Sequence, residues 1–394
     1  MPVTARLADK FRFRGEDLRR LPETRAVFVR ADGSFPAQAE TFRQPALAAT
    51  LRAVATQGTD YMYKGPWAAK LVAAVQADSG KMTLEDLSGY EVIWDEPLVA
   101  NIGAYQVYTN RPPNMGGVGL IEAQNLAAAA NLTADGHWSK SGVALRKAVD
   151  ITQMIFLDYL PESMLKQVYP GLDLTPTART TEIHAKELWS RMKAGVMPFR
   201  FKPAEPKHSD DVVAVDKDGN IAAITHSINC VDWGKTAIFV DGISIGDPAS
   251  FQQAAIAKVK PGSRLPAPTE TGILFKDGKP VLGFASMGSG LHQRTFQALL
   301  NVTQFGMTVD QAINAPDFFL SRADAKTGML TVNVPKGRFP RAVLDEMGYA
   351  YEEFDATQVR FGGEGLWVGI SRDPGTGQLR AASHNRNNSA AVAY

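Results

Sequence analysis

Apolar residues recur three or four positions apart through much of the first half of the chain, which is the spacing of amphipathic helices. The segment 65–80 carries such a stripe, beginning at Trp67 and Leu71, and we expect it to pack into a core. Residues 101–126 instead predict a strand, an irregular turn and a helix. The helices predicted by periodicity are 44–58, 65–80, 141–160 and 177–195.

The pattern changes after residues 196–210, a charged stretch with three prolines and no periodicity that predicts an exposed connection. Short apolar runs then alternate with turn signals, which predicts strands joined in hairpins. Their near-continuous hydrophobicity predicts a sheet covered on both faces. Helices early and a layered sheet late indicate the α+β class. The strands are predicted at 211–216, 221–228, 236–242, 272–286 and 366–384, and two helices at 291–305 and 309–314.

One predicted hairpin joins the strands around 211–216 and 221–228. Its turn, Asp216 to Asn220, suits a type I turn followed by Gly219 in the left-handed conformation, giving a three-residue loop with a bulge. That register sets Ser209 opposite Ser227.

Side chains alternate along a strand, so Thr225, Ser227 and Asn229 share one face and His226 points to the other. A hydroxyl at the end of one strand would therefore face small polar groups on its neighbour. Periodicity alone leaves two interpretations open: a polar sheet face beside a loop, or a nucleophile with its supporting residues.

Composition narrows the function classes. The chain has 394 residues, 42 Lys and Arg against 41 Asp and Glu, and six His, so charge gives no argument for nucleic acid or an acidic membrane. A single cysteine, Cys230, excludes an internal disulfide and is expected to be a small buried residue. No HExxH motif, apolar run of membrane length or secretory h-region is present, and no cofactor is implied.

The order of several motifs resembles the gamma-glutamyltransferase family of N-terminal-nucleophile hydrolases across nearly the whole chain. The matching phrases are Tyr63-Lys64-Gly65, LEDLSGY at 84–90, YQVYTNRPPNMGGVGLIEAQNL at 105–126, VVAVDKDGNIAAITHSIN at 212–229 and ASMGSG at 285–290. The resemblance implies a four-layer αββα fold, formed by a mainly helical large-subunit part, 1–208, and a small-subunit part, 209–394, as one domain.

In that family a precursor cuts itself before a threonine, which becomes the N-terminal nucleophile. Ser209 stands at that position here, so the resemblance implies a cut between His208 and Ser209. The cut would free an α-amine on Ser209, which titrates near ~7.7–8.0 and can act as the base for the hydroxyl. His208 is otherwise expected to be a solvated linker residue.

The resemblance also assigns supporting residues. Ser227 matches a hydroxyl that supports the nucleophile, and Asn229 a residue near the substrate. Gly288 and Ser289 stand where the family has two glycines whose N–H groups form an oxyanion hole. The same Met287–Gly290 stretch equally suits an ordinary strand-to-helix turn.

The glutamyl-binding residues of the family are not matched. Ala267-Pro268 replaces a serine pair that holds the α-carboxylate, so we expect an acyl group other than γ-glutamyl. Asp247 follows the strand after which the family holds the α-amine, and it either receives an amine or is a turn residue. Gly116–Leu120 superficially resembles a nucleotide-binding loop but lacks the full motif.

Met1 aligns inside the family's large subunit, so we expect either a piece of a longer, exported protein or a shortened relative with a changed pocket. The chain as given suggests the cytoplasm, and an upstream segment would suggest the periplasm or secretion. The favoured function is a self-processing amide hydrolase or acyltransferase whose two fragments stay together as a heterodimer. The alternatives are an uncut binding protein and attack on a ketone with C–C cleavage.

Overall fold

The structure is a computed structural model that forms two compact units. The first unit comprises Met1–Asp95 and Ile228–Ala255, and the second Glu96–Ser227 and Ile256–Tyr394. Both units contain residues from before and after position 208. The predicted parts 1–208 and 209–394 therefore do not coincide with the two units; they are the two fragments of the predicted cut and stay a prediction. The structure describes residues 1–155, 162–193, 208–247, 256–257, 259–288, 290–320, 330–356, 365–384 and 390–392, without the side chains of Glu162, Met164, His208 and Asn229.

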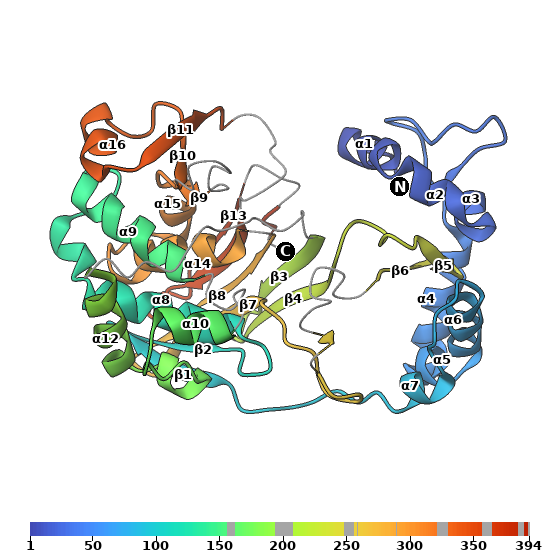
Figure 1. Cartoon of the computed structure of the whole chain (residues 1–394). Helices are drawn as coiled ribbons and strands as arrows, with labels where there is room; N and C mark the ends of the chain where they lie inside the picture. The colour runs from blue at the N-terminus through green and yellow to red at the C-terminus, as the bar shows by residue number, and fades with distance from the viewer. Residues whose placement is uncertain are drawn as a thin grey trace. The chain divides into compact units, whose positions relative to one another are not determined.

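The first unit is mainly helical (Figure 1). Its buried side chains form two small cores. Phe11, Phe28 and Trp233 pack with further aromatic rings in one core, while Trp67 and Leu71 belong to the other, which confirms the predicted stripe. Its elements are α1 (Ala5–Phe13), α2 (Gly15–Arg20), α3 (Pro22–Phe28), α4 (Pro45–Gln57), α5 (Asp60–Tyr63), α6 (Pro66–Ala77), α7 (Leu84–Ser88), β5 (Ile238–Val240) and β6 (Ile243–Ile245).

The second unit contains an antiparallel sheet of six strands in the order β1-β2-β7-β8-β12-β13. A smaller sheet, β11-β10-β9, has its first pair parallel. The strands are β1 (Leu98–Ile102), β2 (Tyr105–Thr109), β3 (His208–Val215), β4 (Ile221–Cys230, whose last residues belong to the first unit), β7 (Glu270–Lys276), β8 (Lys279–Met287), β9 (Phe319–Leu320), β10 (Thr331–Pro335), β11 (Ala350–Phe354), β12 (Leu366–Arg372) and β13 (Leu379–Ser383).

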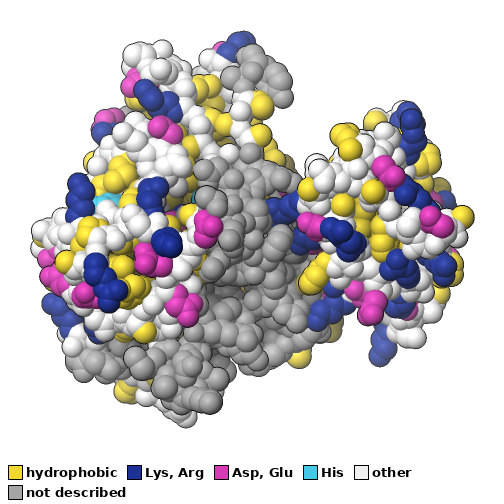
Figure 2. Space-filling view, turned by 90° about the horizontal axis from the view of Figure 1, so that it is seen from above, with side chains coloured by type: hydrophobic (Ala, Val, Ile, Leu, Met, Phe, Trp, Pro, Cys, Tyr) yellow, Lys and Arg dark blue, Asp and Glu magenta, His cyan; other side chains and the backbone are white. Residues whose placement is uncertain are grey.

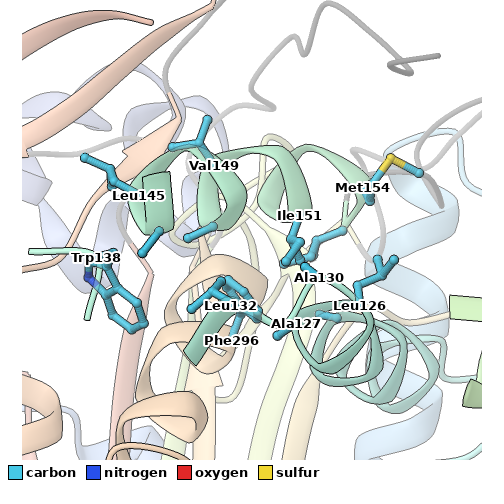
Figure 3. Close-up of a cluster of buried hydrophobic side chains, with 14 of the residues drawn as sticks. Leu126, Ala127, Ala130, Leu132, Trp138, Leu145, Val149, Ile151, Met154 and Phe296 are labelled. Carbon is cyan, nitrogen blue, oxygen red and sulfur yellow. The ribbon is translucent and has the colours of Figure 1, made fainter. Parts of the chain in front are cut away.

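The helices of the second unit pack around a large core. Figure 3 shows Leu126, Leu145, Val149 and Phe296 converging there from three helices, with Trp138 beside them. The helices are α8 (Gly116–Ala129), η1 (Leu132–Asp135), α9 (Gly142–Met154), α10 (Glu162–Val168), α11 (Pro176–Arg179), α12 (Glu182–Lys193), α14 (Leu291–Thr303), α15 (Val309–Asn314) and α16 (Arg341–Met347).

Alternation along β8 separates two layers around the large sheet. Leu282 and Phe284 join a core with residues of α8 and α14, so those helices cover one face. Gly283 faces the other way, where a Cβ atom would lie 2.4 Å from Ile221 and 2.9 Å from Val213. The β3–β4 hairpin therefore packs against the opposite face of the sheet from the helices (Figure 1).

The prediction of a sheet covered on both faces is correct for β8 and wrong for the hairpin. Phe284 and Ala285 are both buried although they point to opposite faces. On the hairpin, Val212 is 54% and Ile224 56% exposed, because only the inner face packs on the sheet. Near-continuous hydrophobicity does not distinguish these two situations.

Most predicted elements are found with shifts of a few residues at their ends. One correction concerns the helix predicted at 177–195, which is divided into α11 and α12. The Thr181 hydroxyl accepts a hydrogen bond from the backbone N–H of His184 at 3.2 Å, and so starts a new helix. The predicted stop at Gly195 lies outside the described residues.

The surface of the described residues carries both signs of charge. On the face seen in Figure 2, Lys and Arg side chains alternate with Asp and Glu. Among the helices that the structure describes, none combines the length and apolarity needed to cross a bilayer.

Candidate active site

Two serine hydroxyls meet at the open end of the β3–β4 hairpin. Ser209 Oγ donates a hydrogen bond to Ser227 Oγ at 2.7 Å. The neighbouring cross-strand pairs, Asp210 with His226 and Asp211 with Thr225, have the same register. The predicted register of this hairpin is therefore confirmed, while the chemical role of Ser209 stays a prediction.

The turn explains why the register is fixed. The backbone N–H of Gly219 donates to the carbonyl of Asp216 at 3.1 Å, and Asp216 N–H donates to the carbonyl of Asn220 at 3.1 Å. Gly219 has φ of 87°, a left-handed conformation that glycine adopts without a Cβ penalty. The predicted three-residue loop is confirmed, and through it the sequence sets which hydroxyls meet at the other end.

A carboxyl group that was not predicted lies next to the serine pair. Asp211 follows Ser209 by two residues on the same face of β3, and its Oδ1 accepts a hydrogen bond from Thr225 Oγ1 at 2.7 Å. Its Oδ2 is buried without a hydrogen-bond partner among the described residues. Burial raises the pKa of Asp211 to about 7; the Thr225 hydroxyl opposes the rise, and the charge of Asp210 adds to it.

The hairpin has a defined direction over the large sheet. Its turn lies at Arg372, since a Cβ on Gly219 would meet that guanidinium at 2.7 Å. Further from the turn, Val213 lies over Gly283 of β8. Ser371 pairs with Leu282, so the turn covers the first half of β8, and Ser209 lies toward the strand's end. This end leads directly into Gly288.

Gly288 occupies the turn between β8 and α14. Its φ is 85°, and its carbonyl accepts a hydrogen bond from the backbone N–H of Leu291 at 3.2 Å. The left-handed conformation explains glycine at this position. Ser289 lies outside the described residues. The oxyanion-hole role of both residues remains a prediction.

A buried His–Glu pair lies behind this turn and was also not predicted. His292, in the first turn of α14, donates from Nδ1 to Oε1 of Glu270 at 2.5 Å. Glu270 pairs with Ser286 in the sheet, and Ser286 Oγ bonds to the carbonyl of Leu291 at 3.1 Å. Because Ser286 shares its face with Phe284, the pair lies on the helix side of the sheet, where it anchors α14.

The other predicted site residues are less fully described. Asn229 lies in β4 and His208 begins β3, but neither side chain is among those described. Asp247 belongs to the first unit, where its Oδ1 accepts a hydrogen bond from the backbone N–H of Lys235. This contact gives Asp247 the loop-stabilising role of a turn residue, and its amine-binding role is untested.

His226 and Cys230, which the sequence analysis did not assign to catalysis, have ordinary structural positions. His226 points away from the serine pair, is exposed, and bonds to Asp210 at 2.8 Å. Cys230 is 4% exposed, and burial raises the pKa of its thiol. Both observations agree with the expectation that neither residue is a catalytic group.

The glycines of 116–120 serve close packing at the start of α8. A Cβ on Gly116 would lie 2.0 Å from the carbonyl oxygen of Thr269, and one on Gly117 2.0 Å from that of Asn110. The backbone N–H of Met115 also donates to the carbonyl of Ala267 at 2.8 Å. These contacts explain the glycines without a nucleotide.

Within the described part of the chain, no group of three or more His, Cys, Asp or Glu side chains is placed to hold a metal ion. The groups that the structure describes at the hairpin end are the hydroxyls of Ser209, Ser227 and Thr225 and the carboxyl of Asp211. Such groups carry out acyl transfer, in which a hydroxyl attacks a carbonyl carbon and donors stabilise the oxyanion.

Comparison with known proteins gives a consistent result. The sequence profile described as gamma-glutamyltranspeptidase matches residues 1–394. A glutathione hydrolase proenzyme of Pseudomonas aeruginosa is 29% identical over 341 residues, which are 80% of this chain and 59% of that protein. An acylase ACY 1 proenzyme of Pseudomonas sp. (strain V22) is 24% identical over 280 residues, 68% of this chain and 49% of that protein. The chain thus spans about half to three fifths of the length of these curated relatives.

Among solved structures, a cephalosporin acylase from Bacillus halodurans superposes with a TM-score of 0.74 at 21% identity, covering 98% of this chain and 70% of that one. The fold of this chain is therefore similar to that of this acylase, which confirms the predicted α+β class.

Proposed function

Because the chain belongs to the gamma-glutamyltranspeptidase family, we propose that it is a self-processing amide hydrolase or acyltransferase with Ser209 as its nucleophile. The observation that carries this proposal is the 2.7 Å hydrogen bond between Ser209 and Ser227 at the open end of the β3–β4 hairpin. The relatives named as proenzymes support processing of the chain, and a cut before Ser209 would make this serine the first residue of the second fragment.

In this proposal the processed site contains its own base. The free α-amine of Ser209 titrates near ~7.7–8.0, so part of it is neutral at physiological pH and accepts the hydroxyl proton. The oxygen then attacks the carbonyl carbon of an amide, and the amine product leaves with a proton. Water or a second amine finally takes the acyl group from Ser209, which restores the hydroxyl.

Ser227 would hold the hydroxyl of Ser209 in one orientation during both steps. The backbone N–H groups of Gly288 and Ser289 would receive the negative charge on the carbonyl oxygen. Each such donor is worth about 2.7–4 kcal/mol of transition-state stabilisation. The placement of Ser209 and Gly288 toward the same end of β8 supports this assignment. The two fragments would remain together, because both compact units take residues from either side of the cut.

We further propose that the acyl group is not γ-glutamyl. The segment 267–269 lies against the start of α8, and Ala267 and Pro268 supply no hydroxyl to a carboxylate there. Asp247 is already bonded to the backbone of Lys235. A glutamyl α-carboxylate would lack the hydroxyl partners of a serine pair at 267–268, which favours an acyl group without that charge.

The proposal is tested by trapping the acyl-enzyme. The protein is mixed with a series of acyl anilides, including γ-glutamyl anilide and neutral aliphatic and aromatic acyl groups, and is quenched in acid. We expect mass spectrometry to find an acyl adduct on Ser209 with a neutral acyl group, and none in Ser209→Ala. Adducts and anilide hydrolysis that persist in Ser209→Ala would contradict the nucleophile, and a preference for γ-glutamyl anilide would contradict the acyl class.

A further inference from the structure

The proposed cut poses a problem that the processed site does not have. In the uncut chain the nitrogen of Ser209 is part of a peptide bond, so it is not basic and cannot accept the hydroxyl proton. The hydroxyl of a serine is a weak nucleophile until some group removes that proton. The self-cleavage proposed above therefore needs a different base from the acyl-transfer steps of the processed enzyme.

Asp211 is placed to meet this need. Two residues along the same face of β3 separate its Cα from that of Ser209 by about 6.6 Å. Ser227, which accepts the hydrogen bond of Ser209, lies diagonally across from Asp211 on β4. Diagonal partners on one face of a hairpin lie about 7–8 Å apart, a span that one water can bridge between two short polar side chains.

The hydrogen bonding of the carboxyl supports the same role. Thr225 donates to Oδ1 at 2.7 Å and so holds the group in one orientation. Oδ2 is buried and has no partner among the described residues. A buried carboxyl oxygen without a partner is costly for a folded protein, and such groups are retained where they do chemistry.

We propose that Asp211 is the proton acceptor for the self-cleavage of the uncut chain. Oδ2 of the ionised carboxyl takes the proton of Ser209 Oγ as that oxygen bonds to the carbonyl carbon of His208. The carbon–nitrogen bond then breaks, and the nitrogen leaves as an amine with the proton returned by Asp211. The product is an ester between His208 and Ser209, which water hydrolyses to a carboxylate and the free hydroxyl. This inference rests on the proposed function.

The acidity of Asp211 suits this use. Its pKa is raised to about 7, chiefly by burial, so a substantial fraction is ionised near neutral pH and the protonated form returns its proton readily. Among the residues that the structure describes, few groups face it. β4 presents the hydroxyls of Thr225 and Ser227, β8 presents Gly283, Ala285 and Met287, and the charged Lys279 and Arg372 lie toward the turn.

Asp210 provides a matched control. It is the adjacent residue on the same strand, carries the same carboxyl group, and points to the exposed face, where it bonds to His226 at 2.8 Å. A change of Asp210 to Asn alters the same charge at nearly the same place in the chain. Its side chain lies on the opposite face from Ser209, so its removal acts on Asp211 only through charge, as a small lowering of the Asp211 pKa.

The test follows cleavage of the full chain after refolding from denaturant, by intact mass at several pH values. We expect the wild-type rate to rise with pH and level off above about 7, as the carboxyl ionises. Asp211→Asn should cut about 100-fold more slowly or worse and lose this rise, whereas Asp210→Asn should stay within about twofold of the wild type. Thr225→Val removes the donor to Oδ1, which should move the rise to higher pH.

If Asp211 had only a structural role, its replacement would affect the cut and amide turnover equally. The proposal predicts a different result. Asp211→Asn should remain folded, because loss of a buried carboxyl with a raised pKa removes a destabilising charge above pH 7; its melting temperature at pH 8 should equal or exceed that of the wild type. On material already cut, the substitution should slow amide turnover at least tenfold less than it slows the cut. Equal effects on both steps, or a normal rate of cutting in Asp211→Asn, would overturn the inference. Failure of the wild type to cut at all would overturn the proposed function and this inference with it.

Discussion

Two neighbouring cross-strand pairs lie on one face of the β3–β4 hairpin. Ser209 bonds to Ser227 at 2.7 Å, and Thr225 bonds to Asp211 at 2.7 Å. The sequence predicted the first pair, since the Asp-Gly turn fixed the register and alternation placed Ser227 on the same face. The same alternation would have placed Asp211 beside Ser209. It was missed because the pKa of this carboxyl is raised chiefly by burial, which depends on packing against β8 and not on local sequence.

At the residue scale, Ser227→Ala removes the group that holds the Ser209 hydroxyl. We expect both self-cleavage and amide turnover to slow by about 10–100-fold, because the loss of one buried hydrogen-bond partner costs about 1–3 kcal/mol. Rates are measured by intact mass for the cut and by amine release for turnover. Ser227→Thr, which keeps the hydroxyl, should retain most of both rates. If Ser227→Ala were as fast as the wild type, Ser227 would have no supporting role.

At the scale of elements, periodicity predicted the helices and hairpins well because each carries its own signal. The divided helix at α11 and α12 needed knowledge of the Thr181 cap, and the exposed outer face of the hairpin needed knowledge of what packs beside it. The buried contacts between distant helices were also beyond the sequence. The clearest is Glu122 of α8, which bonds to Arg179 of α11 at 2.6 Å and to His184 of α12 at 2.9 Å.

Glu122 joins three helices through charged groups that are almost wholly buried. Although burial alone would raise the pKa of this carboxyl, Arg179 and His184 hold it below its usual value. Glu122→Gln removes a buried negative charge that contacts Arg179 and His184, so we expect the free energy of unfolding to fall by about 3–5 kcal/mol. Urea denaturation measures this change.

The exposed pair of Glu182 and Lys186 on α12 offers the comparison. Glu182→Gln should change the free energy of unfolding by less than about 1 kcal/mol, since exposed ion pairs contribute little. Equal effects of the two substitutions would show that the buried group does not hold α8, α11 and α12 together.

At the scale of the whole molecule, sequence alone gave the class and order of elements but not the division into two compact units. The first unit combines Met1–Asp95 with Ile228–Ala255, and a combination of distant segments leaves no local signature. The proposed cut falls after His208, the first residue of β3, and β3 belongs to the second unit. The cut leaves both units made of two chains. Self-cleavage would thus create the free α-amine of Ser209, while the segments of each unit stay packed together.

The central claim is that the hydroxyl of Ser209 attacks the peptide bond that precedes it. The most direct measurement is the intact mass of freshly purified, folded protein, with Ser209→Ala prepared in parallel. The account predicts two fragments in the wild type, one ending at His208 and one beginning at Ser209, and a single uncut chain in the variant. A single full-length mass for the folded wild type, or the same two fragments from Ser209→Ala, would contradict it.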